Sequence, residues 1–356
     1  MISSDAGRLR VPSMGTLLIR GRVLLPGLTL ALLVAIVARA TTNFLPAILS
    51  EVLVAVWLGL LIASAPWLPA TTVAGLRFAQ QRILRLGIIL LGARLSLMDV
   101  ATIGLGALGL VVVCMAAVFG FVLLVGRLMN LPRRLVLLIG VGTAVCGNSA
   151  IIATAPVVKA EEREVSFAVA TITLFGTLAV FLYPLLGGAL HLSDSVFGLW
   201  TGVAVNDTSQ VVAASTAYST AARDVATVVK LVRNTLMAPL ILLIAFWWSR
   251  TTPAAVTGET ARQGALKAFP LFVLGFLGMA LLRTVGIIDP PSARLIDEVA
   301  KVCILIALAA VGLSTRLALL RAVGPAPFFL GLGAGALLSV LSLLGITMLH
   351  LSPVTP

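Results

Sequence analysis

Apolar runs of about twenty residues recur along this chain from Val23 to Leu349, and a helix of about that length crosses the ~30 Å hydrocarbon layer of a bilayer. Of the 356 residues, 60% are hydrophobic and only 11% are charged, against about 25% charged in an ordinary soluble domain. A soluble core could not bury so much apolar surface. The sequence therefore predicts an all-α, polytopic membrane protein, because only helices and closed barrels span a bilayer.

The hydropathy pattern predicts ten or eleven transmembrane helices. They form a single transmembrane domain at 23–350, preceded by a basic, cytoplasmic N-terminal segment at 1–22. The pattern leaves open whether 83–98, 135–158 and 197–217 are full spans or re-entrant, because the first is short and the others are interrupted by small or polar residues. The predicted segments are 23–38, 47–65, 83–98, 101–126, 135–158, 165–187, 197–217, 225–249, 268–286, 296–316 and 325–349.

The formal net charge of +12 raises nucleic-acid binding as an alternative. The basic residues, however, cluster at the ends of alternate predicted segments, as they do in the cytoplasmic loops of membrane proteins. This distribution predicts a cytoplasmic N-terminus, with lipid and not nucleic acid as the surroundings. The clusters are Arg8, Arg10, Arg20 and Arg22; Arg77, Arg82 and Arg85; Arg127, Arg133 and Arg134; Arg250, Arg262 and Lys267; and Arg316 and Arg321.

The residues that usually bind metals or carry out catalysis are few and scattered. Cys114, Cys146 and Cys303 lie in predicted spans without neighbours at metal-ligand spacing. The two histidines, His191 and His350, lie near segment ends, and neither belongs to an HExxH motif. We therefore expect no metal, no cofactor and no enzymatic activity.

Polar residues retained inside a membrane are candidates for function, because burying them in lipid is unfavourable. The first such group is Cys146, Gly147, Asn148 and Ser149, within the Gly-rich segment 135–158. Glycines and small hydroxyl groups allow a helix to break at membrane depth, and the next half-helix then presents N–H groups that favour anions. We predict that these residues contribute to a substrate site, with close helix packing through small residues as the alternative.

The second group is the run Asn206, Asp207, Thr208, Ser209 and Gln210 inside an apolar segment. Such a run cannot face lipid, so it lines an enclosed cavity or, alternatively, forms a surface loop. Asp207 is the one carboxylate that the pattern places near the midplane. It is the predicted ion-coupling residue, because it can carry a proton, bind Na⁺ or pair with a cation. The other four residues are predicted to bind substrate.

The third group is Lys230, Arg233 and Asn234, which precede Pro239 in the same predicted helix. At about 1.5 Å per residue, Arg233 lies roughly 10 Å inside the span. Two cations at that depth would bind an oxyanion, and we assign all three residues to the substrate site. The alternative is a span that begins later, with both cations at the interface. Pro239 is expected to kink the helix.

Two pairs of segments resemble each other, as the halves of an inverted-repeat transporter do. Residues 91–97 are similar to residues 311–317, and the predicted topology runs these two helices in opposite directions. Residues 142–149, GTAVCGNS, are similar to residues 202–209, GVAVNDTS. One predicted span separates the second pair, so both members would run the same way unless one is a re-entrant hairpin.

With these motifs the sequence resembles the YeiH-like sulfate exporter family of bacteria over nearly its whole length. That family is related to the bile acid, arsenite and riboflavin transporters, which use inverted repeats and crossing broken helices. The resemblance implies that the segments around Cys146 and Gln210 are the crossing elements. The sequence departs from the family pattern at Asn206, where histidine is frequent, and at Asn148, where a smaller residue is usual. The matching stretches are 86–96, 146–151, 171–177 with Tyr183-Pro184, 209–214 and 228–234.

The resemblance implies a secondary transporter in the bacterial inner membrane that exports a small anion such as sulfate, sulfite or an organosulfonate. Lys230 and Arg233 would supply charge, the neighbouring polar residues would orient the anion, and Asp207 would couple it to an ion. Two alternatives stay open, a passive anion channel and a carrier of an organic anion coupled to Na⁺ or H⁺. The oligomeric state also stays open, with a homodimer as one alternative.

Overall fold

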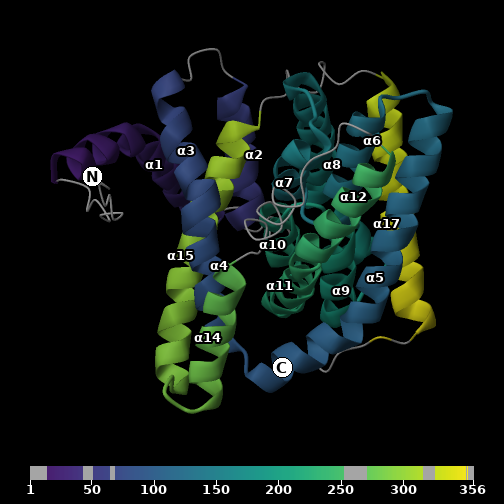
Figure 1. Ribbon diagram of the computed structural model, residues 1–356. Coiled ribbons are helices and arrows are strands. Elements are labelled where there is room, and N and C mark those ends of the chain that lie inside the picture. The colour runs from purple at the N-terminus through teal and green to yellow at the C-terminus, as the bar shows by residue number, and fades with distance from the viewer. Residues whose placement is uncertain are drawn as a thin grey trace, which may run out of the picture.

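The computed structural model describes residues 14–42, 51–64, 69–251, 271–315, 325–349 and Leu351. Every regular element in these ranges is a helix, and no strand occurs among them. The helices form two bundles, one built from the N-terminal helices and two late ones, the other from the middle of the chain and the last helix (Figure 1). The prediction of a polytopic α-helical membrane protein is confirmed.

The flanking bundle, on the left in Figure 1, joins early helices to late ones. In it α15 packs against α1, α2 and α4, while α14 packs against α4. Its elements are α1 (Met14–Thr42), α2 (Glu51–Ala63), η1 (Ala70–Thr72), α3 (Val73–Phe78), η2 (Ala79–Ile83), α4 (Leu84–Leu91), η3 (Gly92–Arg94), α14 (Phe272–Thr284) and α15 (Pro290–Ser314).

The hairpin bundle, on the right in Figure 1, contains all three groups of polar residues singled out above. Its last helix, α17, packs against α5, α8 and α9 and so closes the bundle. Its elements are α5 (Leu97–Leu128), α6 (Arg133–Ala144), α7 (Asn148–Val158), α8 (Glu162–Ala189), α9 (Asp194–Ala204), α10 (Thr208–Tyr218), α11 (Thr220–Thr235), α12 (Met237–Thr251) and α17 (Pro325–Met348).

Helices α2 and α15 of the flanking bundle approach each other to backbone contact. A Cβ atom added at Gly59 would lie 2.7 Å from the main-chain nitrogen of Leu313, and one added at Gly312 would lie 2.3 Å from the carbonyl oxygen of Val56. Small residues at helix contacts allow such packing in a bilayer, where lipid competes with side chains for apolar contact. The two glycines therefore hold this pair together.

Helices α6 and α7 form a re-entrant hairpin, which we call hairpin 1 (133–158). Its two ends lie together, because Arg134 Nη1 is 3.8 Å from Glu161 Oε1. Near the bend, a Cβ atom at Gly142 would lie 2.9 Å from Ile151 Cδ1. A straight helix would separate residues 134 and 161 by about 40 Å. The segment therefore enters the bundle and returns to the end from which it came.

Helices α9 and α10 form a second re-entrant hairpin, hairpin 2 (194–218). The Tyr218 hydroxyl donates to the carbonyl of Leu192, which precedes α9. The Tyr218 ring also stacks on Phe197, with 3.9 Å between ring centroids. The last residue of α10 thus lies beside the start of α9, and this segment does not cross the bundle either.

The two hairpins enter from opposite ends of the hairpin bundle. Helix α8 connects them, and its 28 residues give it a length of about 42 Å. The pair 142–149 and 202–209 therefore has the opposite orientation that an inverted repeat requires, because both segments are re-entrant. The resemblance implied broken helices that cross, and the structure corrects this: both are broken, but each returns to its own end.

Because two of the ten or eleven predicted segments are hairpins, fewer segments than predicted cross the bundle among the described residues. Segment 83–98 is the later part of a helical run from Ala70 to Arg94, which meets Leu97–Leu105 at an angle of 107°. Taken as one bent span, this pair would raise the number of candidate spans among the described residues from five to six. The five described helices long and apolar enough to cross a membrane alone are Val23–Thr42, Ala107–Leu128, Glu162–Ala189, Thr220–Trp248 and Pro325–Met348.

Helices α4 and α15 run in opposite directions, as the similarity of 91–97 and 311–317 requires. Gln80 Nε2, one turn before α4, donates to the Ala310 carbonyl near the end of α15. Arg94, after α4, pairs with Asp297 near the start of α15. Residues 316 and 317 lie outside the described residues, so the comparison holds for 311–315.

Candidate functional site

The bends of the two hairpins meet inside the hairpin bundle. Gly147 at the bend of hairpin 1 has φ 63° and ψ −127°, a conformation that glycine adopts far more readily than other residues. A Cβ atom there would lie 3.5 Å from the Cα and Cβ atoms of Asp207, at the bend of hairpin 2. The two polar motifs identified in the sequence are therefore in contact.

Lys230 joins the two bends. It lies on α11, its side chain is fully buried, and all three of its hydrogen bonds go to main-chain carbonyls. One acceptor belongs to hairpin 1 and two belong to hairpin 2, so a single ammonium group bridges the hairpins. The acceptors are the carbonyls of Val145 at 2.8 Å, Val205 at 3.0 Å and Asn206.

Arg233 joins the same bends one turn further along α11. Its guanidinium group is fully buried and donates to two carbonyls of each hairpin. We call Lys230 and Arg233 the tip cluster. The acceptors of Arg233 are the carbonyls of Thr143 and Ala144 in hairpin 1 and of Val203 and Val205 in hairpin 2.

The tip cluster satisfies the carbonyl ends of two half-helices. Helices α6 and α9 end at Ala144 and Ala204, and their last carbonyls have no partners within the helix. Buried cations at this position satisfy the carbonyls and oppose the negative ends of two helix dipoles. The alternative of interfacial cations is not supported, because α11 begins at Thr220, well before Lys230, and both side chains are fully buried.

The residues at the start of α7 and α10 face the surface of the hairpin bundle. Ser149 is exposed, while Asn148, Asp207 and Thr208 are half-buried. Asn148 Nδ2 lies 3.2 Å from Thr173 Oγ1, an interaction within this bundle that joins hairpin 1 to α8. Because α10 packs against α2 and α15, these side chains lie near the junction of the two bundles.

Asp207 caps the N-terminus of α10. Its Oδ1 atom accepts from the Ser209 amide at 2.9 Å and from the Ser209 hydroxyl at 2.6 Å. Gln210 completes the cap by accepting from the Asp207 amide at 3.2 Å. Asn234, on α11, donates to the Thr208 hydroxyl at 3.2 Å. These predicted site residues therefore form one network, and a helix cap is a structural role for Asp207 beside the predicted coupling role.

The remaining predicted residues are buried behind this surface. Cys146 lies 3.2 Å, sulfur to sulfur, from Met237 of α12. The side-chain carbonyl oxygens of Asn206 and Asn234 are buried without a hydrogen-bond partner among the described residues. Pro239 follows a break in the helix at Leu236, between α11 and α12, which agrees with the predicted kink.

A second charged cluster, buried except for Arg94, lies between the two bundles at the end where hairpin 2 begins. Arg94 Nε is 2.7 Å from Asp224 Oδ2, and Arg94 Nη1 is 3.2 Å from Asp297 Oδ2. Arg223 Nη2 is 2.9 Å from Asp224 Oδ1 and 3.1 Å from Asp297 Oδ1. We call these four residues the Arg94 cluster, which joins η3 and α15 to α11.

This cluster was not predicted from the sequence, because the predicted span begins at 225, just beyond Arg223 and Asp224. Asp297 also pairs with Lys301 at 3.0 Å, one turn further along α15. Asp224 and Asp297 are buried carboxylates within helices, whereas Asp207 is half-buried. The adjacent charges at 223 and 224, beside an apolar run, were the available signal.

Comparisons with known proteins give the family. Residues 26–331 match the family described as conserved hypothetical protein 698. A UPF0324 membrane protein of Bacillus cereus is 33% identical over 317 residues, which cover 88% of this chain and 89% of the relative. One of Pseudomonas aeruginosa is 35% identical over 292 residues, or 79% and 81%. The chain therefore belongs to the conserved hypothetical protein 698 family, together with the UPF0324 membrane proteins.

Proposed function

We propose that the protein is a secondary transporter that exports a small anion of the sulfate, sulfite or organosulfonate class across a bacterial inner membrane. The observation that carries the proposal is the meeting of two re-entrant hairpins that enter from opposite ends. Discontinuous helices that meet inside a membrane form the substrate sites of many secondary transporters.

The electrostatics of the bends favour an anion. Helices α7 and α10 both begin at the bends, so their positive ends lie at the proposed site. The N–H groups of α7 have no side-chain cap, whereas Asp207 caps α10. The ionisable groups there are Lys230, Arg233 and Asp207, whose formal charges sum to +1. The carbonyl ends of α6 and α9 are already satisfied by the tip cluster. The electrostatic interaction at this position is therefore more favourable for an anion than for a cation.

The structure suggests a division of roles among the predicted residues. Asn148, Ser149 and Thr208 are accessible enough to contact an anion directly. Lys230 and Arg233 attract the anion through their charge without contacting it, because their hydrogen bonds go to carbonyls and both side chains are fully buried. Asp207 is the proposed ion-coupling residue, with H⁺ or Na⁺ as its partner, since it lies at the contact of the hairpins.

The substrate class and the direction of transport rest on the resemblance to the YeiH-like exporters. The orientation rests on charge, because Arg127, Arg133 and Arg134 lie at the end where hairpin 1 begins. By the positive-inside rule this end faces the cytoplasm. The N-terminus is then cytoplasmic as well, and the Arg94 cluster lies toward the outside.

Counterflow in liposomes tests the proposal. Purified protein is reconstituted with unlabelled sulfate inside, and uptake of radiolabelled sulfate is followed. A carrier produces a transient accumulation above equilibrium, which a passive channel does not. The double substitution Asn148→Ala with Ser149→Ala should lower the rate at least about tenfold, because each hydrogen bond to a charged ligand contributes about 1.5–3 kcal/mol.

Ser64→Ala is the matched control, because Ser64 is an exposed serine at the end of α2, in the flanking bundle. It should leave the rate unchanged. Uptake that only equilibrates would favour the channel alternative. Full activity of the double variant would place the site elsewhere, and activity with an organic anion alone would favour the coupled organic-anion carrier.

A further inference from the structure

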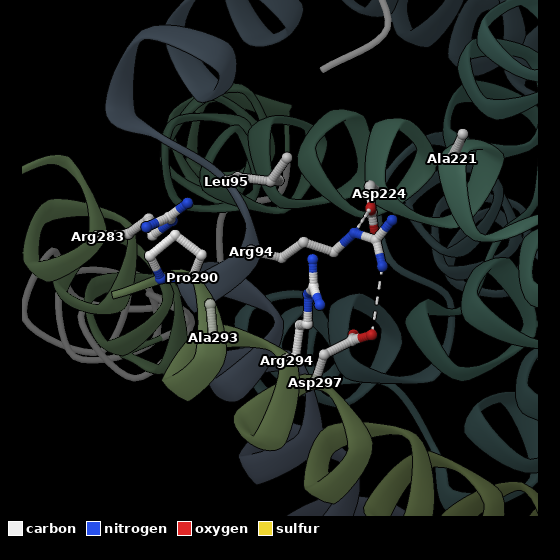
Figure 2. A pocket seen from close by; sticks show the side chains of 9 residues that line it. All are labelled: Arg94, Leu95, Ala221, Asp224, Arg283, Pro290, Ala293, Arg294 and Asp297. Atoms are coloured by element: carbon white, nitrogen blue, oxygen red, sulfur yellow. Dashed lines mark hydrogen bonds and ion pairs between the residues drawn. The ribbon is translucent and has the colours of Figure 1, made fainter. Parts of the chain in front are cut away.

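A cavity of about 400 Å³ lies beside the Arg94 cluster, separate from the hairpin bends. It is formed where η3, the start of α11, the end of α14 and the first turns of α15 meet (Figure 2). The volume exceeds that of several water molecules at about 30 Å³ each. The residues that line it are Arg94, Leu95, Ala221, Asp224, Arg283, Pro290, Ala293, Arg294 and Asp297.

The two carboxylates in this wall are already neutralised. Asp224 accepts from Arg94 and Arg223, each through a different oxygen. Asp297 likewise accepts from both arginines and from Lys301. Each carboxylate therefore has at least two cationic partners, and neither has a free charge with which to repel an anion strongly.

Other arginines at the cavity carry positive charge that is not paired with these two carboxylates. Arg283 donates to the main-chain carbonyl of Ile288 at 2.9 Å and forms no salt bridge with the described residues, although its charge acts on the nearby Asp289. Arg294 is exposed and has no hydrogen bond or ion pair with the described part of the chain. In Figure 2 its side chain points toward the side chain of Arg94, and both residues line the cavity. Nη1 of the neighbouring, fully buried Arg223 also lacks an acceptor among the described residues.

We propose that this cavity is a second anion-binding site, which takes a small oxyanion such as sulfate between Arg294 and Arg94. Two guanidinium groups that converge on one space repel each other, and an oxyanion placed between them removes that repulsion and accepts forked hydrogen bonds from both. The start of α15 adds the positive end of a helix dipole to the same wall. The site is a property of the bundle junction and does not depend on the proposed transport at the bends.

The site places an anion next to the ion pairs that join the two bundles. Arg94 and Asp297 belong to the flanking bundle, and Arg223 and Asp224 belong to the hairpin bundle. An oxyanion bound to Arg94 competes with Asp224 for the same guanidinium group. Occupancy should therefore weaken the contact between the bundles at this end of the molecule.

Sulfate binding to the purified full chain tests the site, with ionic strength held constant by chloride. Binding is followed through alkylation of an introduced cysteine, Ala221→Cys, because Ala221 is half-buried in the cavity wall. Saturating sulfate should slow alkylation several-fold. Adding Arg294→Gln should raise the sulfate concentration needed for half-protection about tenfold, as expected for loss of one charged hydrogen-bond partner.

Arg127→Gln is the matched control, because it removes one positive charge from an exposed arginine at the end of α5. It should leave protection unchanged. Equal protection in Arg294→Gln and Arg127→Gln, or no protection in Ala221→Cys alone, overturns the proposal. Protection that is kept in the Asn148→Ala, Ser149→Ala background shows that this site is independent of the hairpin bends, whereas its loss there would also overturn it.

Discussion

Helix α11 carries two buried charged clusters that are held in different ways. In the tip cluster, Lys230 and Arg233 donate only to main-chain carbonyls. In the Arg94 cluster, two turns nearer the start of the helix, Arg223 and Asp224 pair with other charged side chains. Buried cations on one helix are thus neutralised by backbone dipoles in one place and by carboxylates in the other.

The difference separates a contact within one bundle from a contact between two. All acceptors of the tip cluster belong to hairpins 1 and 2, so they stay together while the hairpin bundle stays folded. The Arg94 cluster joins α11 of the hairpin bundle to η3 and α15 of the flanking bundle. Relative movement of the bundles would therefore break the second set of bonds and leave the first intact.

The largest effect is expected from Arg233→Gln, which removes the group that satisfies four buried carbonyls. The Val205 carbonyl keeps Lys230 as a donor, so three carbonyls are left without a partner. Each costs about 1–3 kcal/mol, and the total loss should be about 3–9 kcal/mol. Thermal unfolding in detergent should show a greatly lowered midpoint or no folded protein. This differs from the expectation for a residue that only binds substrate, whose loss would leave folding intact.

Arg233→Lys sharpens this prediction. An ammonium group keeps the charge but cannot reach acceptors in the fork geometry of a guanidinium group. Its stability should fall between those of the wild type and Arg233→Gln. Equal stability of all three proteins would contradict the role of Arg233 in holding the hairpins together.

A smaller effect is expected from Asp224→Asn, which keeps the shape of the side chain and removes its charge. Arg223, fully buried, then keeps only Asp297 as an ionised partner. Loss of one partner of a buried pair costs about 3–5 kcal/mol. The amide oxygen retains part of the hydrogen bonding, so we expect the free energy of unfolding to fall by about 2–4 kcal/mol. Thermal unfolding measures this loss.

A double-mutant cycle with Arg94→Gln tests whether the loss comes from the pairing between bundles. The two side chains are in contact, so their effects should not add, and a coupling of about 1 kcal/mol or more is expected. Strict additivity would mean that Asp224 stabilises α11 without joining the bundles. The comparison between the two clusters would then fail.

The sequence predicted those features that depend on residues close together in the chain. Broken helices at Cys146–Gly147 and Asn206–Asp207 follow from polar and small residues at membrane depth, and the family resemblance implied that the two segments cross. The re-entrant course of both hairpins could not be predicted, because it depends on packing among residues such as Phe197 and Tyr218. Hydropathy alone cannot tell a hairpin from a span of the same length.

The acceptors of the buried cations were also beyond prediction from sequence. A lysine deep in a helix indicates that some negative group lies nearby, but not whether it is a ligand, a carboxylate or a carbonyl. Arg233 and Arg223 are alike in sequence, both buried on α11, yet their partners differ. Asp297 lies 74 residues from Arg223, and Thr143 lies 90 residues from Arg233. No local pattern reports partners at such separations.

The smallest effect is expected from Gly176→Ala on α8, which disturbs hairpin 2 without removing any charge. A Cβ atom at Gly176 would lie 1.8 Å from Gln210 Oε1, so the glutamine side chain must move. Oε1 then releases the Asp207 amide, and half of the cap on α10 is lost. Loss of a cap contributes about 0.5–2 kcal/mol, and we expect about 1 kcal/mol in thermal unfolding.

Gly188→Ala is the matched control, because it lies on the same helix and a Cβ atom there has no neighbour within 4 Å. Since alanine favours a helix over glycine by roughly 1 kcal/mol in water, Gly188→Ala should be neutral or stabilising. Equal stability of the two variants would show that the Gln210 side chain rearranges freely. Hairpin 2 would then be held at its bend by the buried cations of α11 alone, and the cap formed by Asp207 and Gln210 would not contribute to its position.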